Sequence, residues 1–237
     1  MEKIKSFSPS PALVGTFNME QIPILTKNQK IILTELAKIE FIQKNFYFTG
    51  GTALAYFYLQ HRLSEDLDFF SEKKFDNQPL ISFFEDLRKK YHFQLKTEQI
   101  ENVNSFYLYL PDKEKLKIDF NYYPFKRVRK SILKEGVWVD SLFDIAINKL
   151  ITIIQRTDVK DFVDFYFLEP KFGVWDLIEG VRVKFRQKIE PYLLASDFLK
   201  VEDFEFLPRM VKPLSLEELK IFFRKLAKKV GMRAVEK

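Results

Sequence analysis

The spacing of hydrophobic and polar residues differs between the two halves of the chain. Up to about residue 138, short apolar runs and alternating runs dominate, as is typical of β-strands. From Ser141 onward, apolar residues recur three and four positions apart, as is typical of helices. The pattern predicts an α+β fold, with a mixed β-sheet flanked by helices in a first domain, residues 1–138, and a helical second domain, residues 139–237.

Each predicted element has its own signals. Thr26 and Gln29 form a capping box, Thr52, Ser141 and Asp158 are placed to cap helices, and Pro170 is expected to end one. Residues 1–25 read as an irregular arm. Strands are predicted at 46–49, 66–70, 93–100, 105–111 and 115–123. Helices are predicted at 26–45, 53–61, 78–92, 141–156, 158–170, 174–189 and 215–230.

Gly50 and Gly51 stand between a predicted strand and a predicted helix, in a chain with only seven glycines. Free backbone N–H groups at such a junction accept phosphate readily. A tight turn without any ligand would use the same two residues, and the glycine pair alone does not separate these interpretations.

Asp66 and Asp68 are placed on one face of the strand "DLDFF", about 7 Å apart. Their apolar neighbours indicate a strand in the core, where two unpaired charges would each cost several kcal/mol. A divalent cation would relieve the repulsion, and carboxylate oxygens are the ligands that Mg²⁺ prefers. Asp119, on the polar face of a later strand, can supply a third carboxylate. Ordinary surface aspartates on an edge strand are the alternative.

Four charged residues follow on two consecutive predicted helices. Lys149 lies at the boundary of an apolar helix face, with Arg156 two turns further on the same side. Asp161 and Asp164 share a face of the next helix because they are three positions apart. Two long side chains extending to solvent, and aspartates that cap a helix or form ion pairs, would explain the same pattern.

Composition narrows the function classes. The 237 residues include no cysteine and two histidines, which excludes disulfides, zinc–thiolate sites and thiol nucleophiles. There is no apolar segment of membrane-span or signal-peptide length, so we expect a cytoplasmic protein without a membrane partner. The formal net charge of +6 suggests a polyanionic partner.

Taken in order, four stretches resemble the nucleotidyltransferase family of AbiEii/AbiGii toxins, within the DNA polymerase β-like superfamily. They are "GGTALA" (50–55), "HRLSEDLDFF" (61–70), "KIDF" (117–120) and "INKLITIIQRTDVKDFVDFYFL" (147–168). The resemblance implies a nucleotidyltransferase-like sheet with Gly50, Gly51 and Thr52 at the triphosphate. Many superfamily members have Gly-Ser where this chain has Gly-Gly-Thr, and the part beyond about residue 170 carries no matching motif.

The same resemblance implies roles for the charged residues. Asp66 and Asp68 match the metal-binding aspartate pair, Lys149 matches a lysine near the nucleotide phosphates, and Asp164 or Asp161 matches the acid of the last motif. Lys149, Arg156 and Asp161 are expected at the nucleotide, and Asp119 is expected as a third metal ligand beside Asp66 and Asp68. The expected catalytic residues are Asp66, Asp68, Asp119, Lys149 and Asp164.

The expected function is Mg²⁺-dependent transfer of a nucleoside monophosphate from an NTP to an acceptor, with two metal ions. The resemblance implies an RNA acceptor such as tRNA, and the toxin of a toxin–antitoxin pair with an antitoxin encoded nearby. Two alternatives stay open: transfer to a small molecule such as an aminoglycoside, and a non-catalytic nucleotide- or nucleic-acid-binding relative.

Overall fold

The alternating segments pair into one mixed sheet in this computed structural model, which describes the backbone of residues 22–235 and the side chains of residues 22–232. Within that part of the chain the sheet has seven strands, in the order β3-β4-β5-β2-β1-β7-β6. β2 is antiparallel to β1 and parallel to β5. The strands are β1 (Tyr47–Thr49), β2 (Leu67–Ser71), β3 (Gln94–Ile100), β4 (Val103–Tyr109), β5 (Lys115–Tyr122), β6 (Ile132–Lys134) and β7 (Val137–Val139).

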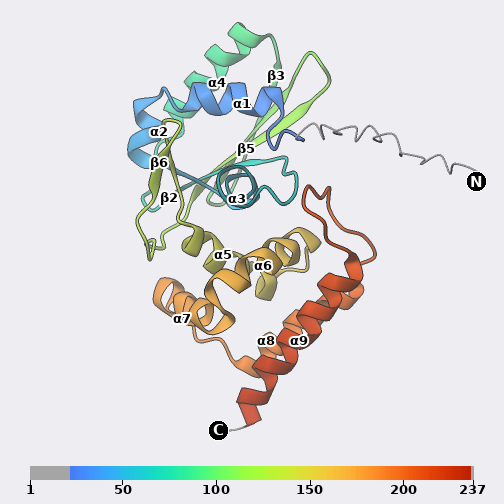
Figure 1. The fold of residues 1–237 in the computed structure, drawn as a ribbon. Helices are drawn as coiled ribbons and strands as arrows, with labels where there is room; N and C mark the ends of the chain where they lie inside the picture. Colours follow the sequence, from blue (N-terminus) through green and yellow to red (C-terminus); the bar gives the residue numbers. More distant parts are fainter. Residues whose placement is uncertain (1–21, 236–237) are drawn as a thin grey trace, which may run out of the picture.

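Helices cover both faces of the sheet. Figure 1 shows α1, α2 and α4 on one side and the group α5 to α9 on the other. None of the helices between residues 22 and 235 combines the length and the hydropathy that a bilayer crossing requires. The helices are α1 (Lys27–Leu36), α2 (Glu40–Asn45), α3 (Gly50–Leu54), the π-helix η1 (Ala55–Leu59), α4 (Gln78–Tyr91), α5 (Leu142–Gln155), α6 (Val159–Phe172), α7 (Val174–Phe185), α8 (Pro191–Leu199), the 3-10 helix η2 (Lys200–Asp203) and α9 (Leu216–Val235).

An aromatic core fills one side of the sheet. Phe69 of β2 stacks on Phe120 of β5 with ring centroids 5.2 Å apart. Phe84 of α4 stacks on Phe106 of β4 at 4.2 Å. Burying each such ring contributes about 1.5–3 kcal/mol relative to leaving it exposed. Because side chains alternate along a strand, the polar neighbours of these phenylalanines face the other side of the sheet, toward α5.

Most predicted elements are confirmed. The capping box of Thr26 and Gln29 is present, although the predicted helix 26–45 is divided into α1 and α2. Ser141 accepts a hydrogen bond at the start of α5, and Asp158 does so at the start of α6. The predicted arm lies, as far as residue 21, outside the described residues. The sheet ends at Val139, while the division into two domains at residue 138 stays a prediction.

Three further features of the fold differ from the prediction. Pro170 does not end α6, which continues to Phe172 and stops at Gly173, where φ is +75°. Proline in the last turn removes only one N–H donor, so the helix tolerates it there, whereas the positive φ of glycine ends it. The β6–β7 hairpin and helix α8 were not predicted from the sequence.

The C-terminal part of the chain returns to the sheet. Residues 209–211 run antiparallel beside residues 61–63, joined by an isolated bridge between Arg62 and Met210. The Leu63 amide donates to the Arg209 carbonyl at 2.8 Å, and the Val211 amide donates to the His61 carbonyl at 2.8 Å. Figure 1 shows this segment reaching up from the helical group to the sheet. The loop between η1 and β2 is therefore held by residues about 150 positions later.

Candidate active site

Two aspartates lie side by side on the polar face of the sheet. Asp68 in β2 and Asp119 in β5 are direct partners in the parallel register. Asp119 is buried, and its Oδ1 accepts a hydrogen bond from the Ser105 hydroxyl at 2.6 Å. The Lys117 ammonium donates to Asp119 Oδ2 at 2.6 Å. The structure thus brings Asp119 beside Asp68, from a strand about 50 residues later.

Asp66 was predicted inside the strand, and this is wrong, because β2 begins at Leu67 and the Asp66 side chain is exposed. Its backbone carbonyl accepts a hydrogen bond from the Thr52 hydroxyl. Loss of hydration raises the pKa of Asp66, and the nearby Asp119 raises it further, against the opposing effect of Lys117. Asp66 therefore remains in the electrostatic reach of Asp119 although it precedes the strand.

The carboxylates disturb one another's ionisation. Loss of hydration raises the pKa of Asp68 to about 7, and the neighbouring Asp119 and Asp66 add to that rise. Lys149 and Lys117 oppose it without cancelling it. A carboxyl group with such a pKa is partly protonated at neutral pH, and a cation beside it would restore its charge.

Gly50 passes directly over Asp68, and Gly51 passes over Arg62. Gly50 has φ of +74°, and a Cβ atom on it would lie 2.1 Å from Asp68 Oδ2. A Cβ atom on Gly51 would lie 2.6 Å from Nη2 of Arg62. Such distances are shorter than any tolerated contact, so a side chain at either position would displace its neighbour. Glycine is required here by close approach, and at Gly50 also by the backbone angle.

Thr52 does not cap a helix, contrary to the prediction. α3 begins at Gly50, Thr49 stands at its N-cap position, and no side chain caps it. The Thr49 hydroxyl instead donates to Asp140 Oδ2 at 3.0 Å. Thr52 is buried within α3 and fixes the backbone of Asp66 through its hydroxyl.

A buried charge cluster on α5 and α6 lies beside the aspartates. Lys149 of α5 forms ion pairs with Asp161 at 2.7 Å and with Asp164 at 2.6 Å. Arg156 donates to Asp161 at 2.8 Å from a side chain that is 61% exposed. Burial opposes the charge of Asp161, yet Lys149 and Arg156 hold its pKa below the usual value. Lys149 is not a helix-edge side chain extending to solvent: it is buried and bound to two carboxylates.

Asp164 is the most enclosed member of the cluster. Arg62 holds it with two hydrogen bonds, Nε to Oδ1 and Nη2 to Oδ2, both 2.7 Å long. His61 Nε2 lies 2.7 Å from Oδ1. Although burial works against ionisation, Lys149 and Arg62 keep the pKa of Asp164 well below its usual range. With all of these partners, Asp164 joins the loop before β2 to helix α6.

A cavity of about 410 Å³ connects these groups, and we call it the central cavity. Of the residues predicted at the site, Thr52, Asp119 and Asp164 are absent from its lining, and the other seven are present. Its walls come from the ends of β1 and β2, the loop between η1 and β2, α5 and α6. The lining residues are Thr49, Gly50, Gly51, Arg62, Ser64, Glu65, Asp66, Asp68, Phe70, Tyr123, Ile145, Asn148, Lys149, Ile151, Thr152, Gln155, Arg156, Asp158, Lys160 and Asp161.

Sequence reasoning did not single out Arg62, Lys117 or Ser105. Arg62 lies within "HRLSED", but an arginine in a polar loop normally reads as exposed. Its complete burial depends on a carboxylate about 100 residues later. Ser105 of β4 is the cross-strand partner of Asp119, and Lys117 precedes Asp119 by two positions in β5. Pairing the predicted strands 105–111 and 115–123 would have indicated both neighbours.

The donor set fits a magnesium ion in its chemistry. The groups on offer are carboxylate oxygens, and the pKa of Asp68 is raised first by loss of hydration and further by the negative charge of Asp119 and Asp66, which a dication would neutralise. Among the described residues, no three carboxylate or imidazole groups are yet close enough to enclose an ion. Oδ2 of Asp119 accepts a hydrogen bond from Lys117. Asp66, Asp68 and Asp119 are the carboxylates of this site that could hold such an ion.

Comparison with known proteins identifies the family. The family model for the nucleotidyl transferase AbiEii toxin, type IV toxin–antitoxin system, matches residues 31–235. The chain belongs to the AbiEii family. This AbiEii-family chain is 32% identical over 211 residues to an uncharacterized protein of Aquifex aeolicus (strain VF5), a match that covers 86% of the chain and 96% of that relative. The resemblance inferred from the four sequence stretches is confirmed.

Solved structures share the fold of the AbiEii-family chain. A candidate nucleotidyltransferase from H. pylori has a TM-score of 0.58 at 19% identity, and the match covers 90% of this chain and 98% of that one. MenT4, a nucleotidyltransferase toxin from Mycobacterium tuberculosis H37Rv, has a TM-score of 0.56 at 15% identity, covering 84% of this chain and 82% of its own. The predicted fold class is therefore confirmed, and with the family match so is the enzyme class of nucleotidyltransferase.

Proposed function

We propose that this AbiEii-family nucleotidyltransferase transfers a nucleoside monophosphate from an NTP to a hydroxyl group of an RNA acceptor, such as a tRNA, in a magnesium-dependent reaction. The observation that carries the proposal is the pairing of Asp68 with Asp119 directly beneath the Gly50 turn. This places Asp68 and the Gly50–Gly51 backbone at one end of the central cavity, with Asp119 next to Asp68 but outside the lining, and cationic side chains of α5 and α6 at the other end.

Gly50 and Gly51 would receive the triphosphate. Because they lack side chains, a phosphate can approach the backbone as closely as Asp68 does. Arg62, Lys149 and Arg156 contribute three positive charges, and Asp161 and Asp164 two negative ones, so the cluster keeps a net charge of +1. Arg156 is the most exposed cation of the three and is free to turn toward a phosphate.

Lys149 would act partly through its partners. Its ammonium is shared between Asp161 and Asp164, yet it also lines the central cavity and is close enough to lower the pKa of Asp68. It therefore adds positive potential where charge develops on the leaving phosphates, while holding α6 in place.

Asp66 and Asp68 would hold magnesium, which when bound supplies charge that stabilises the phosphates and lowers the pKa of the attacking hydroxyl. Asp119 would orient or deprotonate that hydroxyl. Its Oδ1 is fixed by Ser105, whereas Oδ2 is held only by Lys117, whose side chain is 30% exposed. Oδ2 is thus the oxygen that can exchange its partner for the acceptor or an ion.

The acceptor and the biological role rest on charge and family. The net charge of +6 favours a polyanionic acceptor over a cationic antibiotic. The family description supports the role of a toxin that an antitoxin counteracts.

The test is to incubate the purified protein with each labelled NTP in turn, Mg²⁺ and total RNA. We expect label in RNA for one or a few nucleotides, and none in EDTA or with Asp68→Asn. Label that appears only on an added aminoglycoside would refute the RNA acceptor, and no transfer from any NTP would refute the proposed function.

A further inference from the structure

A second cavity lies at the opposite ends of β1 and β2 from the central cavity. Its volume is about 620 Å³, and we call it the basic pocket. β1 runs from this pocket toward Gly50, and β2 runs from Asp68 back to it. Asp68 and Glu72 are four residue steps apart, which corresponds to ~13 Å in extended backbone. The pocket is lined by Gln43, Lys44, Asn45, Phe46, Tyr47, Ser71, Glu72, Lys73, Lys126, Arg127, Val128, Arg129, Lys130, Ser131 and Trp138.

The charge of the basic pocket is one-sided. Its lining has six cationic side chains and one carboxylate, whereas the central cavity has four cationic side chains and five carboxylates. The one carboxylate, Glu72, is already paired with Arg127 at 2.8 Å. Within residues 22–232, no carboxylate forms an ion pair with four of the cations: Lys73, Lys126, Arg129 and Lys130. Such a concentration of unpaired positive charge favours an anionic ligand.

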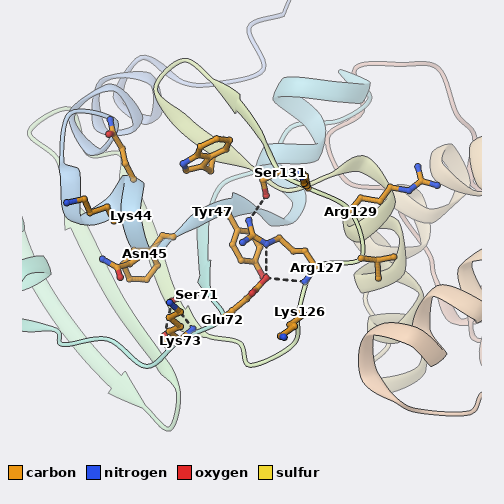
Figure 2. A pocket seen from close by; sticks show the side chains of 15 residues that line it. Lys44, Asn45, Tyr47, Ser71, Glu72, Lys73, Lys126, Arg127, Arg129 and Ser131 are labelled. Atoms are coloured by element: carbon orange, nitrogen blue, oxygen red, sulfur yellow. Dashed lines mark hydrogen bonds and ion pairs between the residues drawn. The ribbon is translucent and has the colours of Figure 1, made fainter.

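The loop that carries most of these cations is fixed in position. The amides of Val128 and Arg129 both donate to the Asp144 carboxylate at 2.9 Å. Asp144 is itself buried and paired with Lys184 at 2.9 Å. Figure 2 shows Arg127 at the centre of the pocket, bonded to Glu72 and Ser131, with Lys44, Lys73 and Lys126 around it. The backbone that carries these cations is therefore held in place, and the guanidinium carbon of Arg129 lies 4.0 Å from the centre of the Phe143 ring.

Aromatic groups add a second kind of contact. Trp138 is 40% exposed on β7. Tyr47 is 2% exposed, its ring lies 4.2 Å from the Arg127 guanidinium carbon, and its hydroxyl has no hydrogen-bond partner among the described residues. An exposed aromatic ring among cations is the arrangement with which proteins bind single-stranded nucleic acids, since bases stack on the ring and phosphates bind the cations.

We propose that the basic pocket binds a segment of single-stranded RNA, with phosphates on residues 126–130 and a base on Trp138. The binding site stands independently of the transfer chemistry, but its assignment to the acceptor strand rests on the proposed function. On that assignment, one segment of the acceptor RNA binds in the pocket, and the reacting end of the same RNA lies ~13 Å away, at the carboxylates. A small phosphate compound could bind the same cations, and the experiment distinguishes it from single-stranded RNA.

The test measures binding of a fluorescent oligouridylate of about 12 nucleotides, in the range of single-strand site sizes, in EDTA without NTP. The double variant Lys126→Ala/Lys130→Ala should bind at least tenfold more weakly. Its slope of log affinity against log salt should be shallower by about 1.4, for two lost phosphate contacts. The matched control is Lys89→Ala/Lys90→Ala, which removes equal charge from exposed lysines of α4 that do not line the pocket. Equal losses in both variants, or none in either, would overturn the proposal.

Trp138 distinguishes the two ligand sources. RNA should quench the intrinsic fluorescence of Trp138, and Trp138→Leu should remove that quench and weaken binding about fivefold or more. Displacement of the RNA by tripolyphosphate, with an unchanged affinity of Trp138→Leu, would identify a small-phosphate site and refute strand binding. Because no NTP or metal is present, these results stand whether or not nucleotide transfer is observed.

Discussion

Replacing Asp68 by asparagine should stabilise the metal-free protein at neutral pH. Folding raises the pKa of the Asp68 carboxyl from 3.8 to about 7. Once the group is ionised in both the folded and the unfolded state, this rise lowers the free energy of unfolding by roughly 1.4 kcal/mol per pKa unit, or about 4 kcal/mol. The side chain is half-buried and partly hydrated, so on the order of 2–4 kcal/mol is expected. The folded state binds the proton more tightly than the unfolded state, so the wild type loses this stability as pH rises from about 4 to 7.

The assay is urea denaturation of wild type and Asp68→Asn in EDTA, from pH 5 to pH 8. The free energy of unfolding of the variant should exceed that of the wild type by a gap that widens by roughly 2–3 kcal/mol across this range. Groups shared by both proteins cancel in the difference. Added Mg²⁺ should stabilise the wild type alone, because the variant has lost a ligand. A variant that is less stable at pH 8, or a gap that does not change with pH, would show that Asp68 serves the fold and is not held against its neighbours' charge.

Two further substitutions have matched controls. Gly50→Ala should abolish transfer and destabilise the protein by more than ~1 kcal/mol. The control Gly173→Ala has nearly the same φ, +75°, and nothing within 4 Å of the added Cβ, so it should show backbone strain only. Equal effects of the two substitutions on activity would contradict the close approach of Gly50 to Asp68. Lys149→Ala should reduce transfer at least tenfold, for ~1.4 kcal/mol of lost transition-state stabilisation. It should also lower the free energy of unfolding by about 3–5 kcal/mol, because two buried carboxylates lose their partner. Lys171→Ala, which removes an exposed lysine of α6 outside the central cavity, should do neither. Normal stability of Lys149→Ala by thermal or urea unfolding would refute its role in holding α6.

Local signals allowed the fold to be predicted, but contacts distant in sequence did not follow from them. Periodicity identified β2, β5 and α5 because each element carries its own pattern, and the polar face of β5 correctly placed Asp119 opposite its apolar residues. The parallel pairing that brings Asp119 beside Asp68 joins strands with two others between them in the chain, so no local signal encodes it. The pattern of its own helix could not separate a surface lysine from a site residue at Lys149, because its partners are on another helix. The interaction of Arg62 with Asp164 could not be predicted for the same reason, because the sequence around either residue gives no sign of the other.

The Arg62–Asp164 pair has a consequence for how relatives of this chain can recombine. It joins the loop that leads into β2 to a helix about 100 residues later, and residues 209–211 lie along the same loop. A chimaera that takes its sheet from one relative and its helices from another would have an unmatched buried charge wherever one of the two parents lacks its member of the pair. Substitution at either position is therefore expected to be accompanied by substitution at the other. The two halves of the chain should be inherited together, and new acceptor preferences should arise by changes at their surface and not by exchange of the helical half.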